Sequence, residues 1–421
     1  MPDIPRLSDD CFALPAGTSW TPVDDALAHL RRHMACIATS EILPIAAAAG
    51  RVLAVDAKAA RSNPPFANAA VDGYGFAAAS LSRAGLERLK LVDGRSAAGA
   101  PFAGVVPVGH AVRILTGASL PEGVDTVIMQ EDVQAEDGAL RFESGIKAGA
   151  NCRDKGEDVD AGAVALAAGV ALGPQQLGLL VALGVSEVEV YQRLRVGVIS
   201  TGDELRQPGQ AATAHQIFDA NRPMLLETIQ SWGFEPVDLG AVGDQRSRVE
   251  QALDDAVQQC DALLTSGGAS AGDEDHMSAI LAEKGKLNLW RIAIKPGRPL
   301  ALALWHGMPV FGLPGNPVAA FTTALIFARP ALGALQGKGW QIPRPYMLPA
   351  AFEKSKKAGR REYLRARRGP DGAVEVFASE GSGRISGLSW ADGLVELPDE
   401  AMRVAKGDLI RFTPFSAFCS A

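Results

Sequence analysis

An alternation of strand-like and helix-like segments, which begins at residue 195, is the feature that most constrains the fold of this chain. Short apolar runs are predicted to be strands, and the amphipathic segments between them are predicted to be helices. The strands are expected at 195–200, 236–242, 261–265 and 309–313, and the helices at 221–232, 246–259, 277–283 and 316–328. This alternation is typical of a doubly wound, parallel α/β sheet that is covered on both faces.

The rest of the chain predicts further units, because a length of 421 residues suits two to four domains. Apolar spacing predicts an amphipathic helix at 22–37, and short β-like runs between glycine and proline turns predict a β-rich module from about residue 50 to residue 151. Three prolines between 341 and 349 indicate a linker. The last segment is expected to form a small barrel or sandwich, with a hairpin that turns at 369–372.

Composition excludes several classes of protein. The formal net charge is −7 without a block of like charges, which argues against a broad nucleic-acid surface. The five cysteines are scattered and form no C-x-x-C motif, and the six histidines have no zinc-ligand spacing. We therefore expect a reduced, cytoplasmic protein without disulfides, and the acidic N-terminus is unlike a signal peptide.

One mostly small and apolar stretch, 163–185, has the length of a membrane span. Its centre, however, holds the sequence GPQQ at 173–176, which lipid tolerates poorly. A short strand followed by a helix that opens near Pro174 is the favoured interpretation, so no membrane segment is expected.

Three glycine-containing loops each follow a predicted strand: STGDEL at 200–205, SGGASAGDED at 266–275 and GLPGNPV at 312–318. In open α/β sheets, ligands bind beyond the carboxyl ends of the strands. Glycines allow close approach of the backbone, and free amides at helix starts favour an anion. Each loop alone could be an ordinary turn, but three in one sheet indicate a ligand site. None is a Walker A or G-x-G-x-x-G sequence, which disfavours ATP-type and dinucleotide sites.

A basic turn, KPGRP at 295–299, follows the predicted strand 290–294. Its two prolines stiffen a segment that presents Lys295 and Arg298, a suitable seat for a tetrahedral oxyanion or a phosphate. The alternative is a solvated basic turn.

Five carboxylates occupy predicted loops rather than helix faces. Near a polyanion such groups would bind a divalent cation or carry protons. Individually each could be a cap or a solvated turn, and Asp244 in particular could cap the helix that follows it. The five are Asp72, Asp158, Glu204, Asp244 and Asp275.

These segments, in this order, resemble the MoeA-type molybdopterin molybdenumtransferases, the family that includes the E domain of gephyrin. The resemblance covers about residues 20 to 415. Besides the loops above, it is carried by AGRVLA at 49–54, PPF at 64–66, DGY at 72–74, LTGA at 115–118, MQE at 129–131, GAN at 149–151 and GEDV at 156–159. The chain departs from the family pattern at Val71, Gly75 and Cys152, which leaves room for a divergent paralogue that handles tungstate or serves one client enzyme.

The resemblance implies four domains and an elongated homodimer. The implied units are a discontinuous N-terminal domain (1–48 and 152–192), a β-rich inserted module (49–151), a molybdopterin-binding α/β domain (193–336) and a C-terminal β-barrel (342–421). The cleft would lie between the α/β domain of one subunit and the β-rich module of the other. An upstream adenylyltransferase and a client molybdoenzyme are implied as partners.

The implied reaction takes adenylylated molybdopterin and molybdate, and it releases AMP and the molybdenum cofactor. Its catalytic acids would be Asp72, Asp158, Glu204 and Asp275. Mg²⁺ would be held by Glu204, Asp244 and Asp275, and molybdate by Lys295, Arg298, Ser386 and Arg365. The pterin and its phosphates would contact Thr201, Gly202, Asp203, Gly267, Gly268, Ser270, Gly272, Pro314, Gly315 and Asn316.

Three rival interpretations remain. A molybdopterin adenylyltransferase would share the α/β domain but lack the flanking units. A non-catalytic molybdopterin carrier or scaffold would deliver the cofactor to an oxidoreductase, although the five retained carboxylates argue against it. A nicotinamide dehydrogenase would need a dinucleotide fingerprint, which the sequence lacks.

Overall fold

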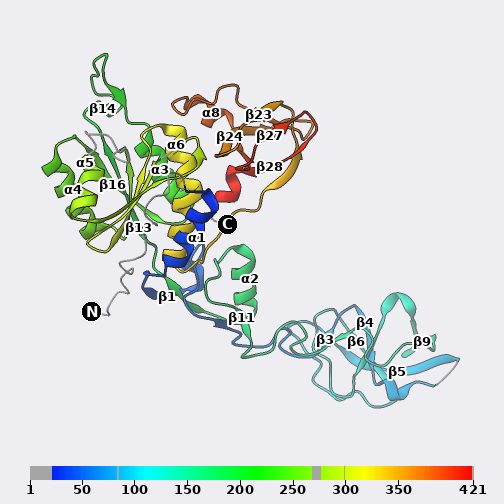
Figure 1. The fold of residues 1–421 in the computed structure, drawn as a ribbon. Coiled ribbons are helices and arrows are strands. Elements are labelled where there is room, and N and C mark those ends of the chain that lie inside the picture. The colour runs from blue at the N-terminus through cyan, green and yellow to red at the C-terminus, as the bar shows by residue number, and fades with distance from the viewer. Residues whose placement is uncertain (1–20, 83–84, 268–275, 298, 420–421) are drawn as a thin grey trace.

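The computed structural model describes residues 21–82, 85–267, 276–297 and 299–419. Its α/β domain contains a six-stranded sheet (Figure 1). The strand order is β16 (Glu235–Val242), β13 (Arg195–Thr201), β17 (Ala262–Ser266), β21 (Met308–Leu313), β20 (Pro299–Trp305) and β18 (Lys286–Arg291). One apolar cluster packs helix α3 (Asn221–Ser231) on one face, and another packs α4 (Arg246–Gln259) and α5 (His276–Glu283) on the other. The predicted doubly wound α/β domain is confirmed.

The sequence predicts a parallel sheet, but two of its strand pairs are antiparallel. Strands β20 and β21 pair in antiparallel fashion, with Trp305 opposite Met308. His306 and Gly307 between them have φ angles of 48° and 89°. Two such residues form the tight turn that suits a hairpin, and a two-residue connection cannot join parallel strands.

The predicted strand 290–294 is divided between two sheets. Its first residues belong to β18, whereas β19 (Ile294–Lys295) pairs in parallel with β24 (Arg361–Arg368) of the C-terminal domain. The two domains therefore meet through backbone hydrogen bonds beside Lys295.

The helix predicted at 316–328 continues further. It comprises α6 (Pro317–Thr323), a π-helical turn (Ala324–Ala328) and α7 (Arg329–Leu335). By length and composition, Pro317–Leu335 is the one helix among the described residues that could cross a membrane, but 78% of its most apolar window is buried inside the protein. It is the central core helix of the α/β domain.

Helix α1 (Val23–His33) ends four residues before its predicted end, because Met34 already has an extended backbone. Its buried residues Val23, Ala26 and Leu30 join the apolar cluster of the α/β domain, which also contains residues of α7. The helix therefore packs on the α/β domain, not within the separate unit to which residues 1–48 were assigned.

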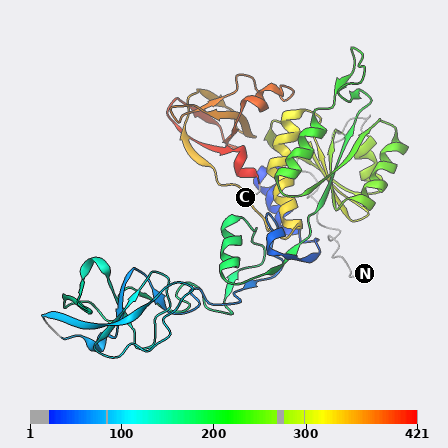
Figure 2. The ribbon, with the colours of Figure 1, turned by 180° about the vertical axis from the view of Figure 1, so that it is seen from behind.

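A connecting unit lies between the α/β domain and the distal end of the molecule (Figure 2). It contains β1 (Ser40–Pro44) paired with β12 (Glu187–Tyr191), β2 (Ala57–Lys58) paired with β11 (Val164–Leu166), and helix α2 (Pro174–Ala182). Leu53 and Ala57 share its core with Leu172 and Leu180. The boundary expected at residue 49 thus falls inside this unit, whereas the strand and helix expected at 163–185 are present.

The distal module, residues 62–160, projects away from the α/β domain in both views (Figures 1 and 2). Its six-stranded sheet has the order β7 (Thr126–Met129), β4 (Gly73–Phe76), β6 (His110–Ile114), β5 (Leu86–Ser96), β9 (Ala139–Glu143) and β8 (Gln134–Glu136). A small pair, β3 (Asn68–Ala69) and β10 (Cys152–Arg153), completes it. The module is β-rich, as expected.

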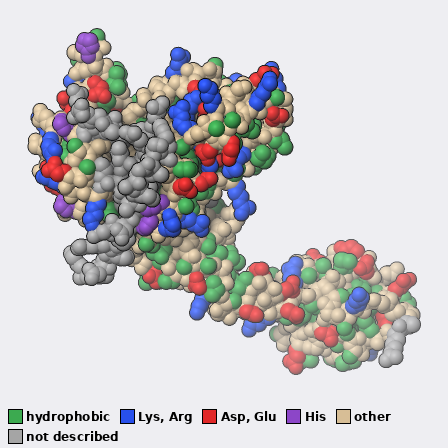
Figure 3. Space-filling model, in the orientation of Figure 1, with side chains coloured by type: hydrophobic (Ala, Val, Ile, Leu, Met, Phe, Trp, Pro, Cys, Tyr) green, Lys and Arg blue, Asp and Glu red, His purple; other side chains and the backbone are tan. Residues whose placement is uncertain are grey.

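The C-terminal domain is also β-rich. Its main sheet has the order β19, β24, β26 (Gly393–Leu397), β28 (Leu409–Pro414) and β22 (Tyr346–Pro349). β25 (Val374–Val376) pairs with β24 to form the predicted hairpin, and β23 (Lys354–Lys356) pairs with β27 (Met402–Val404). Helix α8 (Ser386–Trp390) contacts β24. Acidic and basic side chains are mixed over the face of the molecule in Figure 3.

Candidate functional site

The first two glycine-containing loops touch at the carboxyl edge of the sheet. Thr201 ends β13, and Gly267 directly follows β17 with a φ of +86°. A Cβ atom at position 267 would lie 2.9 Å from the Thr201 carbonyl oxygen and 3.0 Å from its Oγ1. Only glycine allows this contact, since both its conformation and the available space exclude a side chain.

The third loop joins them. The Gly267 N–H donates to the Leu313 carbonyl oxygen at 3.3 Å, and a Cβ on Gly315 would lie 3.9 Å from the Gly267 Cα. Thr201, Gly267 and Gly315 therefore lie together, as their positions after parallel strands predict. Pro314 is buried, whereas Gly315 and Asn316 are exposed.

Asn221, which begins α3, was not among the site residues expected from the sequence. Its Nδ2 donates to Ser266 Oγ at 2.7 Å and to the Gly315 carbonyl oxygen at 2.7 Å. One side chain thus connects the second loop to the third. The only sequence signal for it was its place at the start of a predicted helix.

Acidic residues of the first loop pair with the loop after β16. Asp203 Oδ1 accepts the Asp244 N–H at 3.1 Å, and Asp244 Oδ2 accepts the Asp203 N–H at 3.1 Å. Asp244 therefore fixes the first loop and does not cap α4, whose N-cap position is Gln245 without a side-chain hydrogen bond. The Glu204 carboxylate folds back over Gly202. Strands β14 (Leu205–Arg206) and β15 (Ile217–Phe218) follow in a projecting segment (Figure 1).

A magnesium ion fits this carboxylate set in chemistry, although the described residues contain no group of three His, Cys, Asp or Glu ligands. Mg²⁺ prefers oxygen ligands, and it usually combines one or two carboxylates with water and substrate phosphates. Exposed Glu204 and Asp244 can supply such oxygens. Asp275 lies outside the described residues, as do Gly268, Ser270, Gly272 and Arg298.

Lys295 lies in a cluster of alternating charges at the junction with the C-terminal domain. Its ammonium forms an ion pair with Glu380 and lies 3.5 Å from Glu362 Oε1. Lys354 forms ion pairs with Glu380 and, at 3.1 Å, with Glu362. Burial alone would lower the pKa of Lys354, but its hydrogen bonds to both glutamates raise it. Hydrogen bonds from Lys295 and Lys354 lower the pKa of Glu380.

Backbone carbonyl oxygens accept hydrogen bonds from the Arg365 guanidinium, and its expected contact with molybdate stays a prediction. The residue is 4% exposed, and it donates to the Arg384 carbonyl oxygen at 2.6 Å, to that of Gly381 at 3.2 Å and to that of Ser379. It also stacks over Phe377. A guanidinium has a fixed fork of donors, so it shapes the loop 379–384. Ser386 is exposed at the start of α8.

The other two predicted acids lie in the distal module. Asp72 Oδ1 accepts the Thr116 Oγ1–H and the Thr116 N–H, each at 2.7 Å, and these bonds lower the pKa of Asp72. Asp158 Oδ2 accepts the Asn63 Nδ2–H at 2.9 Å. A single chain does not bring this module to β13 and β14 (Figure 1). The meeting of these acids with Glu204 across two subunits stays a prediction.

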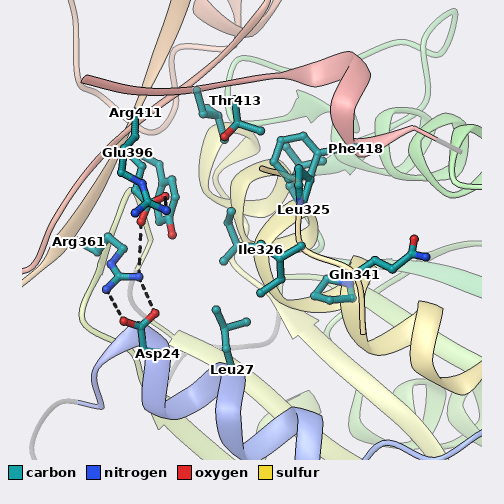
Figure 4. A pocket seen from close by; sticks show the side chains of 15 residues that line it. Asp24, Leu27, Leu325, Ile326, Gln341, Arg361, Glu396, Arg411, Thr413 and Phe418 are labelled. Atoms are coloured by element: carbon teal, nitrogen blue, oxygen red, sulfur yellow. Dashed lines mark hydrogen bonds and ion pairs between the residues drawn. The ribbon is translucent and has the colours of Figure 1, made fainter. Parts of the chain in front are cut away.

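A separate cavity lies between α1, the core helix and the C-terminal domain (Figure 4). Leu27, Leu325 and Ile326 form apolar walls, and Arg361 joins Asp24 with two hydrogen bonds of 2.7 and 2.8 Å. It shares no residue with the loops at the sheet edge.

A doubly wound α/β domain with three converging loops, together with two β-rich units, defines a multidomain α/β class of protein. Comparison with known families agrees. Residues 21–184 match the MoeA N-terminal region (domain I and II), 197–334 a probable molybdopterin binding domain, and 348–415 the MoeA C-terminal region (domain IV).

Similar proteins cover between 72% and 94% of the chain. The molybdopterin molybdenumtransferase of Haemophilus influenzae is 37% identical over 94% of this chain and 98% of its own length. That of a Nostoc species is 34% identical over 72% of this chain and 71% of its own length. The crystal structure of the molybdopterin biosynthesis MoeA protein from Pyrococcus horikoshii has a TM-score of 0.82 at 29% identity, over 94% of this chain and 100% of that one. The chain belongs to the molybdopterin molybdenumtransferase family, and it is a transferase with a role in molybdenum cofactor biosynthesis.

Proposed function

We propose that this enzyme inserts molybdenum from molybdate into adenylylated molybdopterin, releasing AMP and the molybdenum cofactor. The observation that carries the proposal is the contact of three glycine-containing loops at one sheet edge, through Thr201, Gly267 and Gly315. Such an edge offers backbone donors at close range to a negatively charged ligand.

The loops supply the grip on the pterin and its phosphates. Thr201 and Gly202 in the first loop and Gly267 in the second take this role, with Gly268, Ser270 and Gly272 from the part outside the described residues. Asp203 holds the first loop through its hydrogen bonds with Asp244. The third loop completes the pterin site with Pro314, Gly315 and Asn316.

Acids near the ligand assist the exchange of oxygen for sulfur on the metal. When the two dithiolene sulfurs bind molybdenum, each displaced oxo ligand takes up two protons and leaves as water. A water molecule cleaves the phosphoanhydride bond of the adenylylated pterin, which releases AMP and leaves the other phosphate on the cofactor. Glu204 and Asp275 serve from the α/β domain, and Asp72 and Asp158 serve from the distal module of a second copy in a homodimer. General acids of this kind accelerate a reaction by about 10²- to 10⁴-fold.

Glu204, Asp244 and Asp275 would hold Mg²⁺, which offsets charge between these carboxylates and the pyrophosphate when bound. Lys295 and Arg298 would bind molybdate, with Ser386 as a further contact. Because Glu380 pairs with Lys295, an oxyanion must exchange with that carboxylate. We assign Arg365 to shaping the neighbouring loop.

The enzyme would act in the cytoplasm, between an adenylyltransferase that supplies its substrate and a client molybdoenzyme that accepts its product. An assay of molybdate-dependent AMP release from adenylylated molybdopterin tests the proposal. Glu204→Gln should lower the rate by about 100-fold or more. Glu283→Gln, which removes only a surface ion pair with Arg246, is the matched control. Pterin binding without AMP release in the wild type would instead indicate a carrier.

A further inference from the structure

We infer that Asn221 is a positioning residue that holds two ligand-binding loops in one arrangement and thereby directs their hydrogen-bond donors toward the anion. The inference rests on the proposed function for the identity of that anion. It begins from one buried side chain that contacts two loops far apart in the sequence, at Ser266 and Gly315.

The orientation of the Asn221 amide is fixed by its partners. The residue is 7% exposed, and its Nδ2 lies 2.7 Å from both Ser266 Oγ and the Gly315 carbonyl oxygen. A carbonyl oxygen can only accept, so the amide must turn its NH₂ group toward it. Both hydrogens of that group are then used, one for each loop.

This arrangement determines what the two loops can offer. Ser266 accepts a hydrogen bond from Asn221, so its own hydroxyl hydrogen remains for another acceptor. In a trans peptide the C=O and N–H point in opposite directions. Asn221 therefore turns the Asn316 N–H away from itself by holding the Gly315 carbonyl. Within the described part of the chain, the Ser266 hydroxyl and the Asn316 N–H have no hydrogen-bond acceptor.

The other polar atom of the Asn221 side chain, Oδ1, also bears on why asparagine occupies this position. Asn221 Oδ1 is shielded from solvent and has no hydrogen-bond donor in the described part of the chain. A buried acceptor without a donor costs free energy, which offsets part of what the two Nδ2 hydrogen bonds contribute to stability. Its two N–H groups explain why it is present.

The backbone that carries Asn221 is rigid, as a positioning residue requires. The next residue, Arg222, forms ion pairs with Asp219 at 3.1 Å and with Asp238 at 2.6 Å. Asp219 also accepts the Arg222 N–H at 3.1 Å. These contacts fix the start of α3 against β16, so the Asn221 amide has little freedom to follow the loops.

The test compares Asn221→Ala and Asn221→Asp with Thr228→Val in the full-length enzyme. Thr228 lies on the same helix, and among the described residues its hydroxyl bonds only to the Met224 carbonyl oxygen, at 2.6 Å, so this variant reports the loss of a structural bond alone. Asn221→Ala should raise KM for adenylylated molybdopterin by about 10- to 100-fold, because small displacements of binding groups have effects of that size. Asn221→Asp should do worse, since a carboxylate would face the Gly315 carbonyl.

Hydrogen exchange separates this inference from the proposed function. Without any ligand, Asn221→Ala should speed exchange of the Gly267 and Val318 N–H groups, which are bonded to the Leu313 and Ser382 carbonyl oxygens, while Thr228→Val leaves both as in the wild type. If the wild type releases no AMP, the proposed function fails, but this exchange result still decides the positioning role. Unchanged exchange in Asn221→Ala, or equal KM for Asn221→Ala and Thr228→Val at matched melting temperatures, would overturn the inference.

Discussion

The carboxyl edge of the α/β sheet and the distal module each carry part of the proposed site, but they hold their polar residues differently. At the sheet edge, loops distant in sequence bond to one another, as Asn221 does with Ser266 and Gly315. In the distal module, Asp72 is held by Thr116, which belongs to the same module. The edge is organised by contacts between loops, and the module by contacts within itself.

This difference determines which residues one chain can assemble. The three loops of the edge meet without help from another molecule. The distal module, by contrast, lies beyond the connecting unit and away from that edge (Figure 2). If both groups of acids act in one reaction, they must therefore come from two copies of the chain.

The largest expected effect tests that conclusion directly. Asp72→Asn and Glu204→Gln should each lower molybdate-dependent AMP release by about 100-fold or more. After subunit exchange, a mixture of the two inactive variants should recover roughly a quarter of the wild-type rate, because half of the dimers are mixed and each has one intact site of two. AMP release after mixing and native mass spectrometry of the dimers provide the measurement.

A second mixture is the control. Asp72→Asn and Asp158→Asn both alter the distal module, so their mixed dimers should contain no intact site and recover nothing. Equal recovery in both mixtures, or none in the first despite confirmed exchange, would show that the edge and the module do not share a site.

The sequence predicted the edge well because its signals are local. Each loop directly follows an apolar strand, and parallel strands bring their carboxyl ends to one side, so Thr201, Gly267 and Gly315 had to be neighbours. The hairpin at His306 and Gly307 was missed because it lacks the Asn-Gly or Asp-Gly pair that marks such turns.

The sequence could not predict contacts that depend on how units pack. Nothing in the periodicity of α1 says that its apolar face covers the α/β domain. Nor does the sequence show that Leu53 packs with Leu172, the contact that places the boundary expected at residue 49 inside the connecting unit. Likewise, the sequence around Arg365 gives no sign of the carbonyl oxygens that accept hydrogen bonds from its guanidinium. Asn221 was missed because its partners are distant in the sequence: Ser266 is 45 positions away and Gly315 is 94 positions away.

The next largest effect concerns the contact between the C-terminal domain and the sheet edge. Arg365→Lys removes the guanidinium that holds the loop 379–384, whose Ser382 carbonyl oxygen accepts the Val318 N–H at 3.1 Å. We expect a loss of ~2–3 kcal/mol in the free energy of unfolding, since buried carbonyls lose their donors.

The matched control is Arg367→Lys on the same strand. Arg367 pairs with Glu375 at 3.0 Å on the surface, where such pairs contribute ~1 kcal/mol or less. Denaturant unfolding of both variants gives the comparison, and equal losses would mean that Arg365 does not shape the loop.

A smaller effect concerns the charges around Lys295. Glu380→Gln should tighten molybdate binding by roughly three- to tenfold, because it removes the carboxylate that competes for the ammonium. Lys354→Gln should weaken binding by a similar factor, since it removes positive charge beside the seat. Isothermal titration with molybdate at low and moderate salt measures both. Tighter binding after Lys354→Gln would mean that molybdate binds elsewhere.

The smallest effect tests whether contacts within the distal module hold Asp72. The hydrogen bond from the Thr116 side chain is the largest cause of the lowered pKa of Asp72, and the bond from the Thr116 backbone N–H is the next largest. Thr116→Val removes only the hydroxyl donor, so the pKa of Asp72 should rise toward its ordinary value. NMR titration of the Asp72 carboxyl carbon measures this change.

The dependence of stability on pH gives an independent measure of the same bond. A carboxyl whose pKa is lowered by folding stabilises the protein above its unfolded pKa, near 4, and that contribution disappears as the pH falls through the folded pKa. The wild type should therefore be slightly more stable than Thr116→Val at pH 6, and the difference should vanish in stronger acid. If the difference persists there, the hydroxyl stabilises the module by packing, and Asp72 is not held by charge.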